Sequence, residues 1–320
     1  MQWTDRIGRR LRLRDLHLLM AVARAGSMAQ AARELAISQP VVSQTIADLE
    51  RTLGIRLLDR TPHGVEPTLY GRALLKRGIV IFDELRESVK ELEFLADPTA
   101  GELRIGCTDA IIAGVLPVII TRLRRRHPRV TFNLTQVQTG SALYEELRQR
   151  NVDLIIGRMM MPLKEGDLAA QVLFDDQPLV VSGLHSRWAR RRRIEMAELI
   201  DETWSLPRPD TVAGALVAEA FRACGLEVPR AHVISNSSSM HYALVMSGQF
   251  LAMPPASTIW FGGKRLPIKI LPVKLPAVAG PMGIITLKSR TISSVVQLFI
   301  NCAREVTATL AKRGARGATT

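Results

Sequence analysis

The sequence predicts a multidomain α/β protein, and three observations support this prediction. The chain has 320 residues, more than one ordinary small domain needs and suited to two or three domains. Its N-terminal part has the pattern of short helices joined by a tight turn, followed by one long helical stretch. From about residue 101 onward, strand-like and helix-like segments alternate, which is typical of an α/β domain.

Three short helices are predicted within residues 13 to 53. The first, LRDLHLLMAVARAG, has apolar residues at helical spacing and ends at Gly26, a residue type common at helix C-caps. The second follows Ser27 and has Gln30 three positions later, the spacing of a capping box. The tight turn before the third helix indicates a helix-turn-helix.

The third helix accounts for an unusual stretch, AISQPVVSQTIADLE at residues 36 to 50. If Ser38 is the N-cap, its hydroxyl can accept a backbone hydrogen bond, and Pro40 lies in the first turn, where proline is tolerated. Apolar residues then recur at spacings of four, three and four, and we expect them to be buried: Val42, Ile46, Leu49 and Leu53. The opposite face carries Gln39, Pro40, Ser43, Gln44, Ala47 and Arg51.

This opposite face suits the edges of DNA bases. Its amide and hydroxyl groups are short and uncharged, and glutamine can pair with adenine through two hydrogen bonds. The formal charge of +13 also indicates a polyanionic partner, with nucleic acid ahead of a membrane surface. We therefore expect the third helix to lie in the major groove of double-stranded DNA. The alternative is a helix triplet that serves only for packing.

A β-hairpin wing is predicted after the third helix. The stretch IRLLDRTPHGVEPT, residues 55 to 68, places two extended segments around Pro62, His63 and Gly64. Arg60 and His63 would lie near the tip of this wing.

Residues 13 to 71 closely resemble, in order and without gaps, the winged helix-turn-helix of LysR-type transcriptional regulators (LTTRs). The stretch AISQPVVSQTIADLERTLGIRLLDR, residues 36 to 60, is the most diagnostic part. The resemblance implies a DNA-binding transcriptional regulator that reads a dyad-symmetric promoter site and responds to a small-molecule inducer. The stretch from Gly64 to Cys107 further resembles a subgroup of regulators of sugar uptake and aromatic catabolism.

The DNA contacts of the family can be carried over by position. They fall on the recognition helix, with Gln30 and Arg60 near phosphates, and the position of Gln44 is often arginine in the family. For Gln44, an adenine preference and a phosphate contact are therefore both open. The expected DNA-binding residues are Gln30, Ser38, Gln39, Pro40, Ser43, Gln44, Arg51, Arg60 and His63.

A long helix is predicted from Thr68, a candidate N-cap, to about Ala96. Leu75, Ile79, Phe82, Val89 and Leu92 lie near one stripe, whereas the side with Glu84, Arg86, Glu87, Lys90 and Glu91 is expected to face water. A helix of this length with one apolar face needs a partner. It is either an internal core helix or a dimerisation helix, and the resemblance implies the latter, with a homotetramer as the full assembly.

The C-terminal region has the alternation of strands and helices that indicates parallel sheets. It contains no P-loop, GxGxxG or GxSxG motif and no metal-ligand spacing, so we expect no cofactor, no metal and no enzymatic activity. The resemblance implies a periplasmic-binding-protein-like (type 2) effector domain of two subdomains, with crossovers near Pro162 and Pro267. The expected boundaries are 1–67, 68–96 and 97–320, with subdomain I at 101–162 and 268–320 and subdomain II at 163–267.

Ligand-binding residues are expected at the C-terminal ends of strands, beside helix N-termini whose free N–H groups favour anions. Any of these hydroxyls could instead be an ordinary helix cap. The candidates are Thr108, Asp109, Thr139, Ser141, Arg158, Arg208, Thr211, Ser237, Ser238 and Met240.

The chemistry of the inducer stays open between a carboxylate, an aromatic acid and a sugar-like compound. Hydroxyls with one or two arginines suit a carboxylate or a hydroxylated ligand. An acid such as Asp109 would repel an anionic effector at the mouth of the cleft. Asp109 either points away from the ligand or indicates a polyol or a cationic effector.

The remaining features concern the cellular compartment, further partners and the competing functions. Three distant cysteines, the lack of a spanning apolar segment and the lack of a secretory signal indicate the cytoplasm and no membrane partner. The basic run around Arg190 to Arg193 is expected to be a solvated face, with a subunit or DNA contact as the alternative. RNA polymerase is a further candidate partner. A solute-binding protein or enzyme built on residues 101 to 320 and an architectural DNA-compacting protein are the competing functions.

Overall fold

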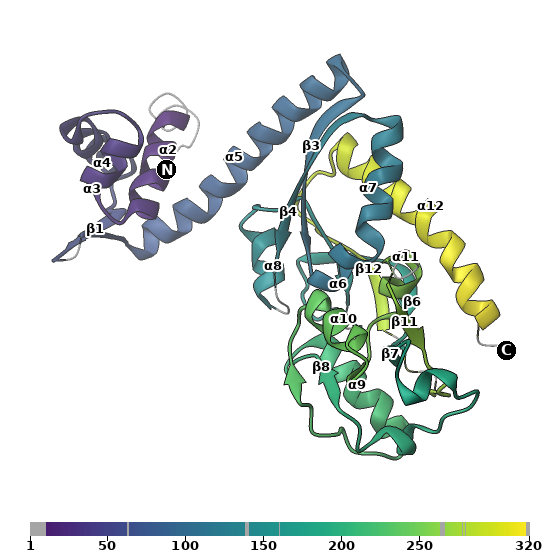
Figure 1. Cartoon of the computed structure of the whole chain (residues 1–320). Helices are drawn as coiled ribbons and strands as arrows, with labels where there is room; N and C mark the ends of the chain where they lie inside the picture. Colours follow the sequence, from purple (N-terminus) through teal and green to yellow (C-terminus); the bar gives the residue numbers. More distant parts are fainter. Residues whose placement is uncertain are drawn as a thin grey trace. The chain divides into compact units, whose positions relative to one another are not determined.

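The computed structural model describes residues 11–317 apart from 63, 138–140, 160, 263–265, 277 and 279. The chain divides into two compact units, residues 1–88 and 89–320, which Figure 1 colours from purple through teal and green to yellow. The N-terminal unit is a winged helix-turn-helix followed by most of a long helix. The C-terminal unit is built on two mixed β-sheets.

The elements of the N-terminal unit follow the predicted order. They are α2 (Leu13–Ala25), α3 (Met28–Glu34), α4 (Gln39–Leu53), β1 (Leu58–Thr61), β2 (Gly64–Pro67) and α5 (Leu69–Ala96). The two strands form an antiparallel hairpin in which Arg60 is the register partner of Val65. One apolar core joins the helices, with Leu19, Val22, Ala31 and Val42 almost fully inaccessible to solvent.

Two glycines hold the wing against the turn between α2 and α3. Gly26 ends α2 in the left-handed region at φ 65°, as the sequence predicts. Its carbonyl oxygen accepts a hydrogen bond from the Val65 backbone at 2.9 Å. A Cβ on Gly64 would lie 2.2 Å from that same oxygen, and Gly64 itself has φ +135°. A side chain at Gly64 would therefore push the wing away from the turn.

Helix α5 begins as predicted but presents the opposite face to solvent. The Thr68 hydroxyl accepts a hydrogen bond from the Gly71 backbone at 3.0 Å, which makes it the N-cap. The charged face expected to be wet makes contacts within the C-terminal unit, because Lys90 Nζ lies 3.8 Å from the Asp153 carboxylate and Glu91 accepts a hydrogen bond from the Ser294 hydroxyl at 2.9 Å. Apolar residues of the C-terminal half point outward instead, with Leu92 67% and Leu95 69% exposed. The prediction of a solvated charged face was wrong for this half of the helix.

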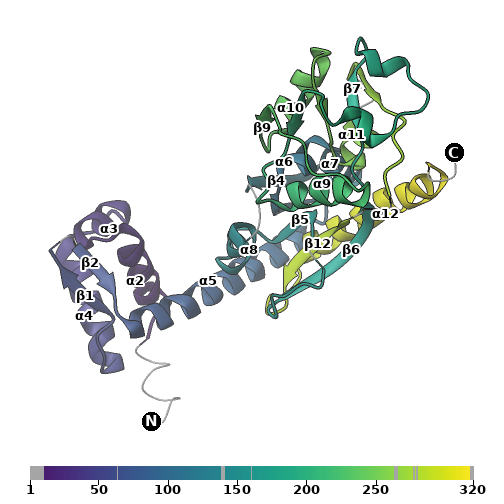
Figure 2. The same ribbon diagram turned by 90° about the horizontal axis from the view of Figure 1, so that it is seen from below.

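The first sheet of the C-terminal unit has the strand order β4-β3-β5-β12-β6. The strands are β3 (Ala100–Cys107), β4 (Arg129–Gln136), β5 (Leu154–Arg158), β6 (Leu168–Asp176) and β12 (Gly280–Leu287). Strands β3, β4 and β5 are parallel, while β12 runs antiparallel to both β5 and β6. Figure 2 shows β5, β12 and β6 side by side.

Helices cover both faces of this first sheet. Its helices are α6 (Asp109–Ala113), α7 (Val115–Arg126), α8 (Ser141–Arg148) and α12 (Ser294–Gly317). The larger core contains Ile119 of α7 and Phe299 of α12, both fully buried with Ile105 of β3. A second core places Leu147 of α8 against Ile155.

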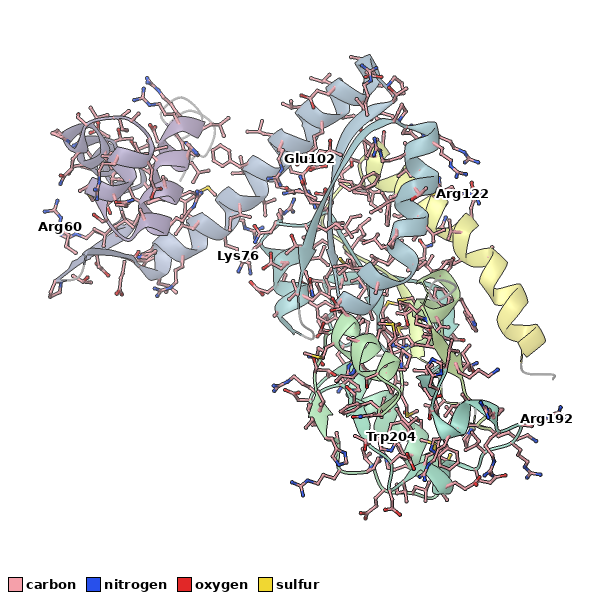
Figure 3. The ribbon with its side chains drawn as sticks, viewed as in Figure 1. Arg60, Lys76, Glu102, Arg122, Arg192 and Trp204 are labelled. Carbon is pink, nitrogen blue, oxygen red and sulfur yellow. The ribbon has the colours of Figure 1, made fainter. Side chains whose placement is uncertain are left out.

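The second sheet has the order β11-β7-β10-β8-β9. The strands are β7 (Val181–Gly183), β8 (Trp204–Leu206), β9 (Val233–Ile234), β10 (Leu251–Ala252) and β11 (Ile268–Ile270). Helices α9 (Val212–Ala223), α10 (Ser238–Met246) and α11 (Ala256–Gly262) accompany it, with the 3-10 turns η1 (Arg187–Arg190) and η2 (Met196–Leu199). Trp204 and Phe221 form the centre of its core, with ring centroids 5.5 Å apart, and Figure 3 labels Trp204 within this core.

The crossovers between the two sheets lie later in the chain than Pro162 and Pro267. Strand β6 pairs with β12 along its length, from Leu168 opposite Leu287 to Asp176 opposite Gly280, so residues 168–176 belong to the first sheet. Strand β11 pairs with β7 in the second sheet. The chain therefore crosses between β6 and β7 and again between β11 and β12. The periplasmic-binding-protein-like plan of two sheets with two crossovers holds with these corrected boundaries.

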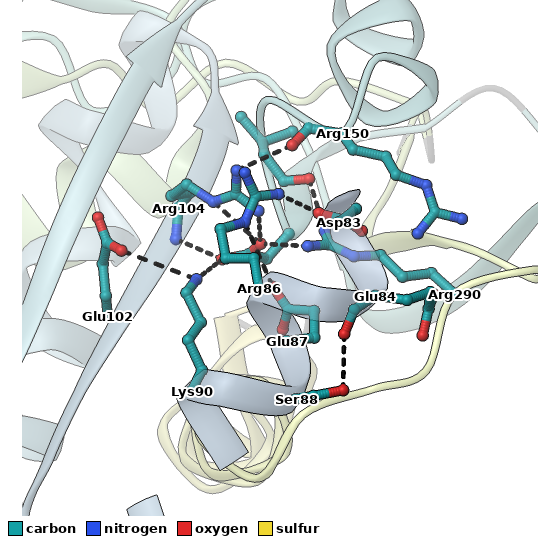
Figure 4. A network of polar contacts seen from close by, with 12 residues as sticks. Asp83, Glu84, Arg86, Glu87, Ser88, Lys90, Glu102, Arg104, Arg150 and Arg290 are labelled. Atoms are coloured by element: carbon teal, nitrogen blue, oxygen red, sulfur yellow. Dashed lines mark hydrogen bonds and ion pairs between the residues drawn. The ribbon is translucent and has the colours of Figure 1, made fainter. Parts of the chain in front are cut away.

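A buried carboxylate joins the end of α5 to the first sheet. Asp153 is 4% exposed and accepts hydrogen bonds from the Arg104 backbone at 2.8 Å and from Arg290 Nη2 at 2.8 Å. The Arg104 guanidinium also contacts it, and Lys90 Nζ of α5 lies 3.8 Å away. Figure 4 labels Arg104, Arg290 and Lys90 in this network. Burial alone would raise the pKa of Asp153, but the Arg104 hydrogen bond and the charges of Arg290, Arg104 and Lys90 lower it below the usual value.

Candidate nucleic-acid interface and ligand cleft

Helix α4 presents its uncharged face to solvent. Val42 is fully buried, Ile46 and Leu49 are each 2% exposed, and Gln39, Pro40 and Gln44 are exposed on the other side of the helix. Ser43 is half-buried at the edge of that face. The apolar residues of α4 recur at the helical period, so they lie on one side, which packs against α2 and α3, and the polar residues lie on the other.

The recognition helix carries an acid that sequence reasoning did not single out. Asp48 Oδ1 accepts a hydrogen bond from Gln44 Nε2 at 2.9 Å and another from Arg51 Nη1 at 2.6 Å. Asp48 stands four positions after Gln44 and three before Arg51, which are the spacings of neighbours on one helix face. It therefore contacts two expected DNA-binding side chains on the exposed surface of the helix.

Two capping predictions need correction. Ser38 occupies the N-cap position of α4 with extended backbone, but its hydroxyl makes no capping hydrogen bond and is exposed. Ser27 does cap α3 by accepting from the Gln30 backbone at 3.4 Å. The Gln30 side chain is not part of a reciprocal capping box, because it contacts Glu34 at 3.1 Å and Arg33 at 2.5 Å.

The wing places Arg60 on the surface, where Figure 3 shows its side chain directed away from the ribbon. His63 lies outside the described residues. Strand β1 also carries the exposed Asp59, opposite Glu66 of β2. The wing is therefore of mixed charge, and Arg60 is the basic group suited to a phosphate.

A cavity of about 660 Å³ lies in the C-terminal unit between the elements of the two sheets. It is large enough for a metabolite-sized ligand. Seven of the expected ligand-binding residues line it: Thr108, Asp109, Arg158, Arg208, Thr211, Ser237 and Ser238. Met240 is 48% exposed and is not among the lining residues. Thr139 and the side chain of Ser141 lie outside the described residues.

Several of these polar groups serve as helix caps or ion pairs. The Thr211 hydroxyl accepts from the Gly214 backbone at 3.1 Å, and the Ser237 hydroxyl accepts from the Met240 backbone at 3.4 Å. Arg208 pairs with Asp210 through two hydrogen bonds at 3.0 and 3.1 Å. Thr211 and Ser237 are therefore helix caps, as the alternative interpretation predicted, and both also line the cavity.

Arg158 is paired with a fully buried acid. Its Nη1 donates to the Asp176 carbonyl at 3.0 Å, and its Nη2 lies 3.3 Å from the Asp176 carboxylate. That carboxylate also accepts from the Ser257 backbone and hydroxyl at 3.0 and 2.6 Å. Burial raises the pKa of Asp176 and lowers the pKa of Arg158, and each charge opposes the shift of the other. Arg158 of this pair lines the cavity.

Asp109 connects the two subdomains across the cavity. Its Oδ2 accepts a hydrogen bond from the backbone N–H of Ser238, the first residue of α10, at 2.5 Å. Its Oδ1 lies 3.4 Å from Gln136 Nε2 at the end of β4. Asp109 thus points into the cleft toward a helix N-terminus. The alternative that Asp109 points away from the ligand site was wrong.

Sequence reasoning missed the aromatic and imidazole groups of the cavity: Tyr144, Tyr242 and His241. His241 and Tyr242 belong to α10 and Tyr144 to α8, where they follow the helical pattern of ordinary core residues. His241 Nε2 lies 2.9 Å from the Ser235 carbonyl and its Nδ1 lies 2.8 Å from the Ser205 hydroxyl. No local motif distinguishes such residues from packing residues, so only the folded structure identifies them.

A family model described as the LysR substrate binding domain matches residues 96–308, and one described as a bacterial regulatory helix-turn-helix protein of the lysR family matches residues 13–72. The chain belongs to the LysR family. The predicted resemblance to LysR-type regulators is therefore confirmed for the helix-turn-helix and for the effector-binding domain. The prediction of a DNA-binding regulator with an effector-binding domain is confirmed as well.

Curated LysR-family relatives match over almost the whole chain. The HTH-type transcriptional regulator GbpR of Azospirillum brasilense is 28% identical over 305 residues, which cover 95% of this chain and 89% of the relative. An uncharacterized HTH-type transcriptional regulator, YdcI of Escherichia coli, is 26% identical over 310 residues, which cover 95% and 99%. These relatives are regulators, so the prediction that the chain is not an enzyme is confirmed, and the alternatives of a free solute-binding protein and an architectural protein fall away.

Solved LysR-family structures share the fold. Full-length CbnR in complex with its target DNA has a TM-score of 0.65 at 23% identity, covering 92% of this chain and all of that one. A full-length cysteine variant of OxyR from Pseudomonas aeruginosa has a TM-score of 0.66 at 21% identity, covering 92% and 95%.

Two of the cysteines of this LysR-family chain, Cys107 and Cys302, are buried, and Cys224 is half-buried. Cys107 is fully buried, and burial raises its pKa to about 12. Burial also raises the pKa of Cys302 and Cys224. All three are free cysteines. At neutral pH these thiols stay protonated, which disfavours thiolate chemistry.

Other features of the described residues are plain. Every helix in that part of the chain is too short or too polar to cross a lipid bilayer, and no group of three or more His, Cys, Asp or Glu there could hold a metal ion.

The basic run is an exposed, largely paired surface: Arg187 contacts Glu202, Arg191 contacts Glu198 at 2.8 Å, and Arg193 contacts Glu195 at 2.9 Å. Figure 3 labels Arg192 at this surface.

Proposed function

We propose that this LysR-family regulator acts in the cytoplasm as a dimer that reads a dyad-symmetric promoter site through two copies of α4. The observation that carries the proposal is the N-terminal part of the exposed face of that helix, where the uncharged Gln39, Pro40 and Gln44 lie on the surface. Amide and hydroxyl groups of this kind can approach base edges closely and form hydrogen bonds with them. A two-fold dimer places two such helices on two half-sites.

The Asp48 contact supports base reading by Gln44. One amide hydrogen of Gln44 is donated to Asp48 at 2.9 Å, which leaves the amide oxygen as an acceptor and the second N–H as a donor. This acceptor and donor together match the amino group and N7 of adenine, whereas a phosphate can use only the donor. We infer that Gln44 contacts a base and that Arg51 and Arg60 contact phosphates.

The exposed apolar side of α5 supports dimerisation through this helix. Val89, Leu92 and Leu95 are 55%, 67% and 69% exposed, and their spacing of three places them on one side of the helix. Such a stripe on a soluble protein is typical of a partner surface. A second copy of α5 covers it in the dimer, and two dimers form the tetramer.

The cavity of about 660 Å³ supports the response to a small-molecule inducer. It lies between the two sheets and is crossed by the Asp109 hydrogen bond to α10. A ligand in the cavity can contact residues from both subdomains, because both contribute lining residues. Such a ligand changes the relative stability of the open and closed conformations of the cleft. The inducer would then alter promoter binding or activation.

A footprint on the promoter next to the chain's own gene tests the DNA-binding proposal. We expect two protected half-sites related by a two-fold axis, with centres about one helical turn or a multiple of it apart. The same protein should give no discrete protection on a scrambled fragment of equal length. Uniform protection of both fragments, or a single unsymmetrical site, would contradict the proposal.

A further inference from the structure

The N-terminus of α10 already holds an anion that belongs to the chain. Helix N-termini attract carboxylates because their first N–H groups lack intrahelical partners. In α10 the Ser238 N–H is bonded to Asp109 Oδ2 at 2.5 Å, and the Met240 N–H is bonded to the Ser237 hydroxyl at 3.4 Å. A ligand carboxylate at this end of the cleft would have to displace Asp109 or lie beside it.

The basic side chains of the cavity do not offset the Asp109 charge. Among the described lining residues, Arg158 is paired with Asp176 and Arg208 with Asp210. Lys164 and Glu165, which also line the cavity, are adjacent in sequence and opposite in charge. An added anion would therefore meet a net negative end of the cleft, and the half-buried Asp109 would repel it.

A second polar group of the cavity lacks a partner. The Tyr242 hydroxyl, on a residue that is 8% exposed, has no hydrogen-bond partner among the described residues. The Thr258 hydroxyl donates to the Pro255 carbonyl at 2.6 Å, and it lies close enough to Tyr242 to oppose the increase in the pKa of Tyr242 that burial causes. A buried hydroxyl without a partner is costly, so a ligand atom that hydrogen-bonds with it gains more than it would on the surface.

The rest of the lining is mostly apolar. Ile155, Ile285 and Ile111 are at most 1% exposed, and Met282, Met253 and Leu143 are at most 7% exposed. Such a wall favours a ligand with a ring or chain face that loses water on binding.

We infer that the effector of this regulator is an uncharged, hydroxyl-bearing compound with an apolar face, and not a carboxylate. One hydroxyl donates to Asp109, another shares a hydrogen bond with Tyr242, and the apolar face lies against the isoleucine and methionine wall. The inference rests on the proposed effector role of the cleft. Of the three inducer classes left open by the sequence, it favours the sugar-like one and extends it to cyclic and aromatic alcohols.

Matched pairs of probes test this inference on the purified full-length protein. D-galactose is compared with D-galacturonate, and 4-hydroxybenzyl alcohol with 4-hydroxybenzoate, by thermal shift, because a ligand that binds the native state raises the melting temperature. In wild type we expect saturable protection by at least one alcohol and none by its acid. A primary amine, 4-hydroxybenzylamine, separates hydroxyl recognition from simple attraction to the Asp109 charge.

Two substitutions make the result specific. Tyr242→Phe should weaken alcohol binding by about tenfold, which corresponds to one hydrogen bond. Asp109→Asn keeps an acceptor for the Ser238 N–H but removes the charge, so it should weaken the alcohol and allow the acid to protect. The exposed Asp201→Asn is the matched control and should behave as wild type.

Several outcomes would overturn the inference. They are protection of wild type by an acid at least as strong as by its alcohol, protection by the amine alone, protection unchanged by both cleft substitutions, or no alcohol protecting at about 20 mM. A promoter footprint of the same preparation separates this failure from failure of the proposed function. A protein that gives the two-fold footprint but fails the probe test leaves DNA recognition intact and removes only the ligand class.

Discussion

At the residue scale, the same chemical group has different roles in the two units. Asp48 is exposed on α4 and contacts Gln44 and Arg51 through its Oδ1 atom. Asp109 lies at the cavity and meets a helix N-terminus at 2.5 Å. The degree of exposure contributes to the difference, because an exposed acid such as Asp48 exchanges partners with water at little cost, whereas the half-buried Asp109 is partly shielded from water.

His241 gives the cavity a pH dependence with a definite sign. The Ser235 carbonyl can only accept, so Nε2 carries a proton, and in the neutral ring Nδ1 accepts from the Ser205 hydroxyl. Burial lowers the pKa of His241 from 6.5, against the opposing effects of the Ser235 carbonyl and Asp109. Below 6.5 the unfolded chain therefore binds more protons at this residue, and the stability it contributes is lost as the pH falls.

We expect the melting temperature of wild type to fall more steeply than that of His241→Gln between about pH 7 and about pH 5. Glutamine keeps a donor for the Ser235 carbonyl without a titrating ring. The exposed His185→Gln is the control and should follow wild type. Parallel pH profiles for wild type and His241→Gln would show that this histidine is not held neutral.

At the element scale, the recognition helix was predictable and the linker helix only in part. The period of Val42, Ile46 and Leu49 fixes which side of α4 is buried, since those residues pack on nearby helices of the same unit. The contacts of Lys90 with Asp153 and of Glu91 with Ser294 join α5 to residues far away in the sequence, so periodicity assigned that face to water. Local sequence determines a helix, but its environment determines which face is wet.

The cleft shows the same limit. Strand-to-helix junctions identified seven of its lining residues, because ligands gather at the ends of parallel strands. The crossovers were misplaced because β6 pairs with β12, whose residues are more than a hundred positions later, from Leu168 opposite Leu287 onward. Tyr242 was missed because an aromatic residue on α10 follows the same pattern whether it packs or lines a cavity.

Asp153 is the polar residue on which the end of α5 and the first sheet depend. It compensates the buried Arg104 and Arg290 and the nearby Lys90. Removing one partner of a buried ionic group costs roughly 3–5 kcal/mol, since the other charges stay buried. We expect Asp153→Ala to lower the melting temperature of the C-terminal unit by several degrees at least, measured by calorimetry. A loss no larger than that of the exposed Asp201→Ala would contradict this role.

The apolar stripe of α5 carries the dimer prediction. Leu92→Glu places a charge on a residue that is 67% exposed, so the fold of one chain should tolerate it. Each dimer carries the substitution twice, and losing burial of a leucine costs about 1.5–3 kcal/mol, so the dimer dissociation constant should rise at least tenfold. Sedimentation velocity measures this change. Val228→Glu, on a residue 43% exposed elsewhere, is the control, and equal behaviour of the two variants would exclude the stripe as the interface.

At the scale of the whole molecule, the charge of +13 acts together with the two recognition helices. Phosphate contacts release counterions, so affinity for any DNA should fall steeply as salt rises. Base contacts should separate the promoter site from other DNA at every salt concentration. The inducer acts on a different unit, the C-terminal one, so a ligand that changes regulation need not touch DNA.

A single titration tests most directly the claim that α4 reads bases. The affinities of wild type, Gln44→Ala and the exposed control Gln149→Ala are measured on the footprinted promoter site and on random DNA at two salt concentrations. We predict that Gln44→Ala loses about 1–3 kcal/mol on the promoter site and much less on random DNA, with an unchanged salt slope. An equal loss on both DNAs, accompanied by a shallower salt slope, would make Gln44 a phosphate contact and contradict the account.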